Sequence, residues 1–342
     1  LADDLTPDVP IEQITLTVDP AYRYGKKVAS GEEVDSCEWI VDRGFGEELE
    51  ARFRQDTMKE LVSYAIGCVM GRYRLDRPGL IYAHSGNERF WEIYEEVKSG
   101  EWRVASGEWR RREERTGSRC LFVSGAHHSS LTTSFLPDED AIIPVTDTEW
   151  FDDDAAHRLI EFISVAWDKT HLEDNLKFLA DNLSPKKTES PRDTIRRYLC
   201  DSFFKDHLQT YKKRPIYWLF SSGKQKAFQC MVYLHRYNEG TLSRMRMEYV
   251  VPLQSKLAAR IDQLDGDIAS ASSTANRNKL QKEKDKIVRQ KDELSRFDEK
   301  LRHYADQRIS LDLDDGVKVN YGKFGDLLAE VKAVAGKSPE SS

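Results

Sequence analysis

Six cationic side chains surround one aromatic stretch of the chain, and their type suits them to bind an anion. They are Lys212, Lys213, Arg214, Lys224, Lys226 and Arg236. Lysine and arginine donate charge-assisted hydrogen bonds to phosphate oxygens, so such a set can follow a nucleic-acid backbone. Equally, these residues can be solvated cations at the edges of a buried hairpin. The sequence leaves both interpretations open.

A second group of chemically capable side chains is acidic and surrounds Trp150-Phe151. Its carboxylates are Asp147, Glu149, Asp152, Asp153 and Asp154. Clustered carboxylates can hold the metal ion of a nuclease, but no lysine in this stretch completes the Asp/Glu-x-Lys arrangement of a common nuclease core. Acidic residues also favour the N-terminus of a helix, because they interact well with the helix dipole. We therefore predict a helix that begins here, and no metal site.

The overall composition limits the class of protein. The 342 residues carry a formal net charge of −7, and the five cysteines are scattered without a CxxC pair. A free-standing DNA-binding module is usually basic, so any contact with nucleic acid must be local. The cysteine pattern argues against a zinc site or a disulfide framework and fits a reducing cytoplasm. No apolar run approaches the roughly 20 residues of a membrane span. Because the chain starts at Leu1, we expect it to be part of a longer polypeptide.

The aromatic stretch between the cations predicts a β-hairpin. Residues 216–220 and 227–234 are two apolar runs rich in aromatic and β-branched side chains, and Ser221-Ser222-Gly223 separates them. Such runs around a glycine-containing turn are typical of paired strands. Pro215 fits the first position of a strand, where no ladder donor is needed. We expect this hairpin to form a core that flanking helices cover.

Periodic apolar residues predict helices on both sides of this hairpin. The clearest early helix spans residues 47–71, and two more are expected over 153–167 and 172–183. Ser190 followed by Pro191 is typical of an N-cap and a first helical turn. The helix that begins at Ser190-Pro191 leads directly into the aromatic stretch.

Residues 239–308 predict an antiparallel coiled-coil helical hairpin. Leu280, Ile287, Leu294 and Leu301 recur at seven-residue spacing in its second arm, which is the pattern of a coiled-coil seam. Each arm would be about 45 Å long at about 1.5 Å per residue. The charges of the second arm are mixed in sign, so we expect a solvated outer face.

These patterns predict an α+β fold that is predominantly helical, with small β-hairpins covered by helices. Alternation around Asp315-Gly316 predicts a second hairpin over residues 309–321. A polar insertion near 99–119, rich in Trp and Arg, is either a surface loop or a loop that faces nucleic acid. We divide the chain into a mixed α/β segment containing that insertion (1–135), helices with the aromatic hairpin (136–238), the helical hairpin (239–308), and the Asp-Gly hairpin with a final helix and a disordered tail (309–342).

Several stretches of this sequence resemble one protein family. Residues 60–68 (ELVSYAIGC) and 71–81 (GRYRLDRPGLI) are similar to the C-terminal half of the PglX family, the large adenine-specific DNA methyltransferases of BREX phage-exclusion systems. Further matches follow in the same order, at 137–145 with 149–151, at 211–220 and at 311–324. The resemblance covers most of the chain, and the 99–119 insertion lies outside it.

The resemblance implies S-adenosylmethionine as methyl donor and adenine N6 as acceptor. Such chemistry needs an Asn/Asp-Pro-Pro-Tyr-type motif to hold the flipped base, and a glycine-rich loop for the cofactor. The sequence contains no Pro-Pro pair. We therefore assign no catalytic, cofactor-binding or metal residue to this chain, and expect S-adenosylmethionine on an upstream, missing part. What remains is target recognition, with the six cations named above as candidate DNA contacts, and a helical spacer.

Two functions from different classes are compatible with these observations. In the first, the chain is the non-catalytic C-terminal portion of a site-specific adenine-N6 DNA methyltransferase in bacterial phage defence. Its partners would then be duplex DNA and the upstream methyltransferase domain, with no membrane. In the second, the chain is a protein-interaction scaffold whose helical hairpin docks other BREX proteins. Both functions place the protein in the cytoplasm.

Overall fold

The computed structural model describes residues 46–77, 79–96 and 135–336. The chain divides into two compact units, Leu1–Glu60 and Leu61–Ser342. Of the first unit, the structure describes only the start of helix α3 (Gly46–Val69), which continues into the second. The predicted 99–119 insertion, much of the predicted 1–135 segment and the end of the predicted tail lie outside the described residues.

Helices account for most of the second unit, and the predicted α+β class with predominant helix is confirmed. Those before the aromatic stretch are α4 (Phe90–Glu96), α5 (Ala155–Ala166), α6 (Leu172–Asp181), α7 (Pro191–Tyr198) and α8 (Phe204–Thr210). Those after it are α9 (Thr241–Arg244), α10 (Val251–Ser270), α11 (Thr274–Asp306), α12 (Gly316–Gly322) and α13 (Val331–Ala335). Within the described ranges, no helix is both long and apolar enough to cross a membrane.

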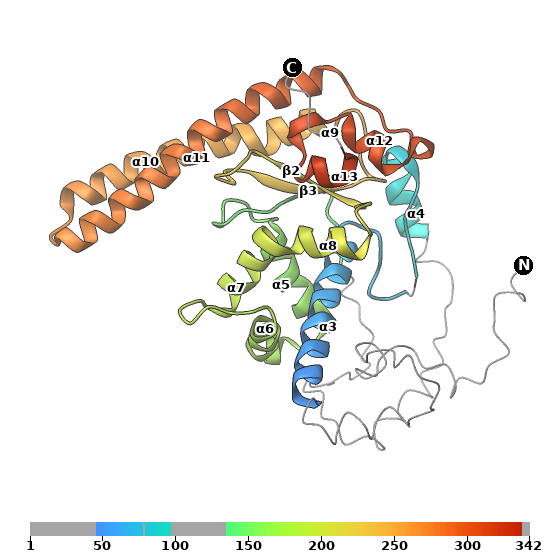
Figure 1. Ribbon diagram of the computed structural model, residues 1–342, viewed down its shortest axis with the longest axis horizontal. Coiled ribbons are helices and arrows are strands. Elements are labelled where there is room, and N and C mark those ends of the chain that lie inside the picture. The colour runs from blue at the N-terminus through green and yellow to red at the C-terminus, as the bar shows by residue number, and fades with distance from the viewer. Residues whose placement is uncertain (1–45, 78, 97–134, 337–342) are drawn as a thin grey trace, which may run out of the picture. The chain divides into compact units, whose positions relative to one another are not determined.

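A three-stranded antiparallel sheet, in the order β1-β3-β2, lies among these helices (Figure 1). Strands β2 (Tyr217–Ser221) and β3 (Gln229–Tyr233) form the predicted aromatic hairpin, with Trp218 opposite Val232. Strand β1 (Ile142–Pro144), for which the sequence predicted no strand, pairs with the other edge of β3. The central strand β3 is therefore buried along its whole length.

The two faces of β2 meet different groups of helices, because successive side chains of a strand point in opposite directions. Tyr217 stacks on His207 of α8, with ring centroids 4.8 Å apart. Trp218 points the other way and packs edge-on against Tyr321 and Phe324, at 5.4 and 5.6 Å. Figure 1 accordingly shows α5, α7 and α8 on one side of the sheet, and α12 and α13 on the other.

Local sequence explains where α5 and α7 begin. The carboxylate of Asp154 accepts the backbone amide of His157 at 2.8 Å and so caps α5. Ser190 and Asp193 form a reciprocal capping box at the start of α7, with Pro191 in its first turn. Both starts match the predictions, because a side-chain oxygen supplies the acceptor that the first helical amides lack. Two π-helical turns join α7 to α8 and α9 to α10 (Leu199–Phe203 and Met245–Val250).

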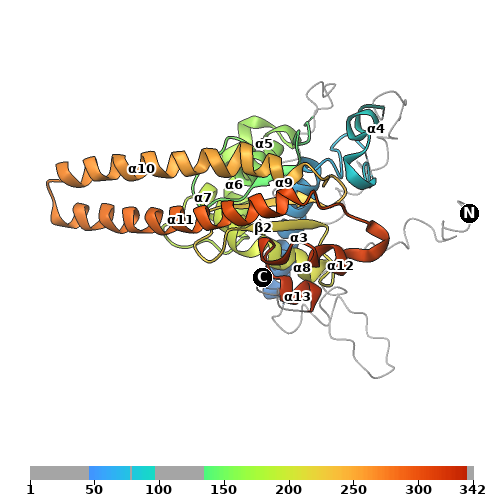
Figure 2. The ribbon, with the colours of Figure 1, turned by 90° about the horizontal axis from the view of Figure 1, so that it is seen from above.

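Helices α10 and α11 pack side by side and extend away from the sheet (Figure 2). The leucine repeat of α11 lies on its inner face, where Ile287, Leu294 and Leu301 are buried. Across the pair, Arg260 of α10 contacts Glu283 of α11 at 2.6 Å. The buried stripe and the ion pair both lie along the contact between the two helices. Coiled-coil packing in the strict sense stays a prediction.

The Asp-Gly hairpin predicted for residues 309–321 is wrong. The segment forms a 3-10 turn at Leu313–Asp315 and then the helix α12. The side-chain amide of Asn320 donates to the carbonyl oxygens of Asp312 and Gly316, with 3.0 Å to the latter. These local bonds favour a turn and a helix over a strand. Tyr321 is fully buried against the sheet, so tertiary packing outweighed the alternating pattern.

Candidate nucleic-acid interface

The loop between α8 and β2 carries three of the predicted cations on an unusual backbone. The amide of Lys213 donates to the carbonyl of Leu208 at 2.7 Å, and that of Lys212 to Gln209 at 3.1 Å, so the helix end is closed by its own backbone. Both lysines have positive φ, 49° at Lys212 and 61° at Lys213. A non-glycine residue in this left-handed region costs roughly 1 kcal/mol. Such strained positions concentrate at functional sites.

A buried histidine holds the two ends of this loop together. Nε2 of His207 accepts the backbone amides of Ile216 and Tyr217, each at 3.1 Å. Burial, together with the nearby Arg72, lowers the pKa of His207 to about 3. The imidazole is therefore neutral at physiological pH and keeps the lone pair that these two amides require. The loop is thus presented on a fixed backbone.

The cationic side chains of this loop are available to a ligand. Lys212, Lys213 and Arg214 are exposed, and none of them has a hydrogen-bond or ion-pair partner for its side chain among the residues that the structure describes. Exposed cations without a carboxylate partner keep their whole charge for an incoming anion. Three of the six predicted residues are therefore exposed and unpaired within the described ranges, and their contact with phosphate stays a prediction.

Arg72 lies beside this loop and was missed by the sequence analysis. Its Nη1 donates to the hydroxyl of Tyr211 at 3.0 Å, and its guanidinium lies over the rings of Tyr73 and Tyr211, at 4.9 and 5.6 Å. Within the described ranges it has no carboxylate partner. A guanidinium held between two rings suits a phosphate or a base edge. The signal that could have found it is the GRYRL motif, which carries the family resemblance and places two arginines beside a tyrosine.

We name Arg72, Lys212, Lys213 and Arg214 the α8-end cluster. The backbone amides of its three loop residues bond to carbonyl oxygens at the end of α8, and the side chain of Arg72 bonds to Tyr211. Its four cations are therefore held by neighbouring backbone and aromatic groups and not by acidic side chains of the described residues. An arrangement of this kind can follow the phosphates of a nucleic-acid backbone.

The two predicted lysines of the β2–β3 turn have different surroundings. Lys224 is exposed, and its side chain has no partner in the part of the chain that the structure describes. Lys226 donates to the carboxylate of Asp201 and to the carbonyl of Cys200, the latter at 2.9 Å. Lys226 therefore anchors the turn to the neighbouring helical segment, and Lys224 alone of the two keeps its charge for a ligand.

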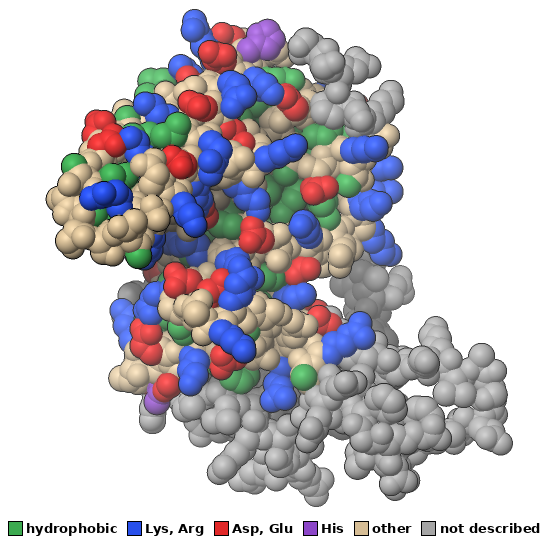
Figure 3. All heavy atoms as spheres, turned by 60° about the vertical axis from the view of Figure 1, so that its left-hand side comes forward, with side chains coloured by type: hydrophobic (Ala, Val, Ile, Leu, Met, Phe, Trp, Pro, Cys, Tyr) green, Lys and Arg blue, Asp and Glu red, His purple; other side chains and the backbone are tan. Residues whose placement is uncertain are grey.

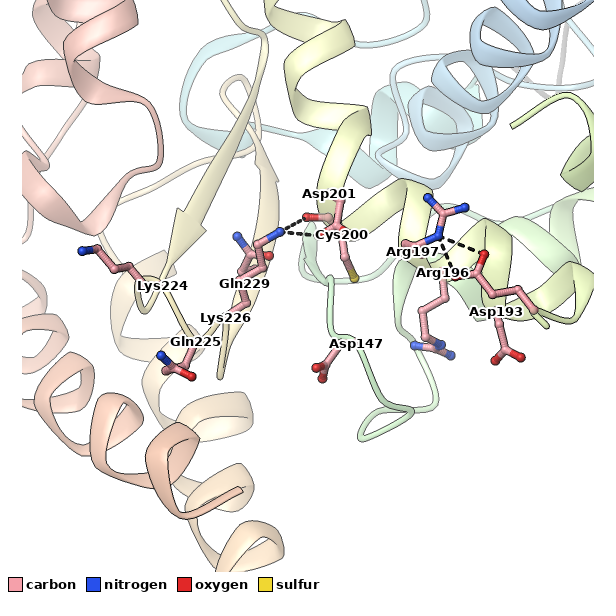
Figure 4. Close-up of a pocket in the computed structure, with 11 residues that line it drawn as sticks. Asp147, Asp193, Arg196, Arg197, Cys200, Asp201, Lys224, Gln225, Lys226 and Gln229 are labelled. Carbon is pink, nitrogen blue, oxygen red and sulfur yellow. Dashed lines mark hydrogen bonds and ion pairs between the residues drawn. The ribbon is translucent and has the colours of Figure 1, made fainter. Parts of the chain in front are cut away.

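A hollow of about 350 Å³ lies between the β2–β3 turn and α7 (Figure 4). Its arginines already face carboxylates: Arg197 donates to Glu189 at 2.8 Å, and Arg196 pairs with the buried Asp154. Hydrogen bonding to Arg197 holds the pKa of Glu189 well below its usual value. Figure 3 likewise shows acidic side chains among the lysines and arginines around this hollowed face. The hollow therefore offers an anion little net positive charge.

The described residues contain neither a parallel sheet with a glycine-rich loop nor a three-residue metal cluster. The sheet is antiparallel throughout, and none of its strands leads through a glycine-rich loop into a helix. In the ranges described, no three His, Cys, Asp or Glu side chains are arranged to hold a metal ion. The acidic stretch serves local structure, because the hydroxyl of Tyr249 contacts Asp140 and Asp153, at 3.0 and 2.9 Å.

The prediction that Arg236 contacts DNA is corrected, because this side chain is only 1% exposed. Its guanidinium donates to the carbonyl oxygens of Asp138 and Glu139, each at 2.7 Å, and its Nε to Oδ1 of Asn87 at 3.0 Å. The ring of Phe90 lies 3.6 Å from the guanidinium carbon. Arg236 therefore joins three segments of the core. Its residue type alone could not distinguish this role from a surface contact.

The comparison with known proteins gives this geometry its context. No family model matches the chain. It is 47% identical over 335 residues to the adenine-specific methyltransferase BrxX of Escherichia coli O9:H4 (strain HS), a match that covers 96% of this chain and 24% of that protein. It is 38% identical over 269 residues to the adenine-specific methyltransferase PglX of Lacticaseibacillus casei (strain Zhang), covering 78% and 19% respectively. The chain thus spans about a quarter or less of the length of these curated relatives. Identity at this level over nearly the whole chain confirms the resemblance: the chain is homologous to a segment of the PglX-type adenine-specific methyltransferases.

Proposed function

We propose that this chain is the non-catalytic C-terminal portion of a site-specific adenine-N6 DNA methyltransferase in BREX phage defence, and that it serves target recognition and as a helical spacer. Homology to BrxX and PglX supports the methyltransferase context. The α8-end cluster is the single observation that carries the DNA-binding role. Its ligand is duplex DNA in the bacterial cytoplasm, and its neighbour in the whole enzyme is the catalytic domain.

The α8-end cluster is positive although the chain as a whole is acidic. With a net charge of −7, the chain as a whole repels a polyanion. Most cations in the first hollow are neutralised by carboxylates, whereas Lys212, Lys213 and Arg214 have no such partner among the described residues. These three cations, unpaired in the described part of the chain, therefore give DNA a local site of attraction on an otherwise acidic chain.

Backbone strain supports the same assignment. Lys212 and Lys213 stand in a conformation that glycine adopts at no steric cost. Two adjacent lysines in that conformation are readily explained if their side chains are needed. Phosphate contact supplies such a need, because it requires a donor at a fixed position but not a packed side chain.

Salt-dependent DNA binding by the 342-residue chain tests the proposal. We expect a labelled duplex to bind at low salt, with an affinity that falls as salt is added. The triple variant Lys212→Ala, Lys213→Ala, Arg214→Ala should bind more weakly, with a salt slope smaller by about three, one for each lost phosphate contact. Fluorescence anisotropy over a salt series measures both quantities.

A matched control uses exposed lysines on the last two helices. Lys318 and Lys332 are exposed residues of α12 and α13, and the variant Lys318→Ala, Lys332→Ala should retain the slope of the parent chain to within one contact. Equal affinity and slope for the parent and the triple variant would refute a role of the α8-end cluster in DNA binding.

We assign S-adenosylmethionine to a part of the methyltransferase outside this chain. The absence of a glycine-rich strand-to-helix loop in the described residues supports this assignment. Titration calorimetry of the chain with S-adenosylmethionine should detect no binding, and a measurable affinity would contradict it.

A protein-interaction scaffold is the second candidate, and the α10–α11 hairpin favours it. The pair extends away from the sheet (Figure 2), and amphipathic helices of this kind commonly bind partner proteins. Replacing residues 262–283 by a short glycine-serine turn would remove the distal part alone. Loss of captured BREX proteins with unchanged DNA affinity would favour the scaffold, and unchanged capture would exclude the hairpin as its docking site.

A further inference from the structure

The β2–β3 turn, residues 222–226, is fastened from two sides. From α11, Glu293 accepts the hydroxyl of Ser222 at 2.7 Å and the backbone amide of Gln225 at 2.8 Å. From the opposite side, Lys226 bonds to Asp201. A hairpin turn is commonly a mobile tip. This turn is instead held in one position by side chains that lie far from it in the sequence.

The backbone of the turn allows little other geometry. Gly223 has a φ of 134°, and a Cβ built there would lie 2.9 Å from a carboxylate oxygen of Glu293. Lys226 has a φ of 49°. Gln290 of α11 adds a contact of 3.3 Å from its amide to the carbonyl oxygen of Gln225. The turn is therefore preorganised, and a ligand that binds its tip would pay little ordering entropy.

The two side chains at the tip of this turn, those of Lys224 and Gln225, make no contact that stabilises the described part of the fold. Lys224 and Gln225 are exposed, and neither side chain has a partner among the residues that the structure describes. Figure 4 shows both pointing away from the contact between Lys226 and Asp201. Hollows of about 350 and 400 Å³ lie on either side, and both are lined by Lys224 and Gln225. The tip is thus a ridge between two depressions.

The second depression contains further cations that could receive a phosphate. Arg289 and Arg296 of α11 line it together with the tip. Both are exposed, and in the described ranges neither has a carboxylate partner; Arg296 contacts only the carbonyl oxygen of Asp292. By contrast, Lys300 in the same depression pairs with Asp326. Two arginines therefore keep their charge beside a rigid ridge.

We propose that the β2–β3 turn enters the major groove of DNA, where the side-chain amide of Gln225 reads an adenine while Lys224, Arg289 and Arg296 contact flanking phosphates. The major groove admits a two-stranded β-ribbon. A glutamine amide donates to adenine N7 and accepts from its N6 amino group, a pair that no other base presents in that groove. This inference rests on the proposed DNA-binding function and specifies the residue that reads sequence.

Selection from a pool of duplexes with a randomised centre tests the reading role. The parent chain should enrich a motif that contains an adenine, and Gln225→Ala should lose the preference for one adenine, by at least about fivefold in relative affinity. Retention of the complete motif by Gln225→Ala would overturn the inference. Binding by the parent chain without any enriched motif would also overturn it, while leaving the proposed DNA-binding function intact.

A modified base gives a sharper test of the atomic contact. Replacing the enriched adenine by 7-deazaadenine removes the N7 acceptor, so the parent chain should lose affinity while Gln225→Ala loses none further. Equal losses for both proteins would show that another residue reads this base. Absence of DNA binding by the parent chain would instead refute the proposed function itself.

Two controls separate reading from general effects. Gln307→Ala removes an exposed glutamine that follows α11 and should leave the motif unchanged. Glu293→Ala should reduce the same adenine preference by freeing the turn, and Glu293→Gln, which keeps an acceptor, should restore part of it. Unchanged selectivity in Glu293→Ala would show that the position of the turn does not matter for reading.

Discussion

At the open end of the aromatic hairpin, the entry to β2 and the exit from β3 treat positive charge in opposite ways. After β3, Arg236 is buried, and its guanidinium donates hydrogen bonds to backbone carbonyl oxygens. Before β2, Lys212 and Lys213 are exposed on a strained loop without partners among the described residues. Both sets are cations from one short stretch of sequence. The comparison teaches that the acceptors around a cation, and not its type, decide whether it holds the fold or remains available to a ligand.

Two other arginines can be assigned by the same criterion, which is whether the surrounding acceptors satisfy the cation. Arg74 is 3% exposed, bonds to Asp76 at 2.6 Å and donates to the carbonyl of Tyr94 at 2.6 Å, so it belongs with Arg236. Arg72, two residues earlier, is half-buried between tyrosine rings and lacks a carboxylate partner in the described ranges. Arg72 therefore lies between the buried structural cations and the exposed cations available to a ligand. Substitution at this single position tests both roles.

The largest expected effect is a loss of stability in Arg236→Leu. The substitution leaves the carbonyl oxygens of Asp138 and Glu139 without their donor, and each buried acceptor left unsatisfied typically costs about 1–3 kcal/mol. We expect urea unfolding to show this loss, with unchanged DNA affinity for the molecules that remain folded. Wild-type stability together with weaker DNA binding would place Arg236 in the interface after all.

The second effect is a dependence of stability on pH through His207. Its pKa is about 6.5 when unfolded and about 3 when folded, so between these values the unfolded chain binds the extra proton. The stabilisation is complete above pH 6.5 and is lost as pH falls, by up to about 1.4 kcal/mol per pH unit. Asp153, whose pKa is raised by burial, acts in the opposite direction.

Comparison with His207→Gln isolates this contribution. Glutamine keeps an acceptor for the amides of Ile216 and Tyr217 but does not titrate, and Asp153 is common to both proteins. The difference in unfolding free energy between parent and variant should therefore shrink as pH falls from 7 to 5. A constant difference would show that His207 does not hold the loop in its neutral form.

The sequence predicted the hairpin, the start of α5, the cap of α7 and the long helices, because these depend on local patterns. It failed where tertiary contacts decide. Residues 309–321 alternate like a strand, yet burial of Tyr321 and the local bonds of Asn320 favour a helix. In the candidate interface, the exposed cations were recognised by type. Arg72 was missed and Arg236 was included wrongly, because neither the rings around the first nor the carbonyls around the second are visible in a sequence.

An intermediate effect is expected for Arg72, which should influence both properties. Arg72→Ala removes two ring contacts and one hydrogen bond, so we expect a stability loss of about 1 kcal/mol and a salt slope of DNA binding smaller by about one. Arg72→Lys keeps the charge but lacks the planar fork, and should recover the slope more than the stability. A stability loss with an unchanged salt slope of DNA binding would show that Arg72 serves the fold and does not contact DNA.

The smallest effect is a gain in stability when one strained lysine is removed. Lys212→Gly relieves a left-handed conformation, which should add about 0.5–1 kcal/mol to the free energy of unfolding, while the salt slope of DNA binding falls by about one. Lys212→Ala loses the same charge without relief of strain, so it should match the glycine variant in slope but not in stability.

Opposite signs for stability and binding at one position are expected only if the strain is retained for the side chain's charge. If the glycine variant is more stable and binds DNA as tightly as the parent, the loop is strained for another reason, and the contrast with Arg236 no longer identifies a binding surface.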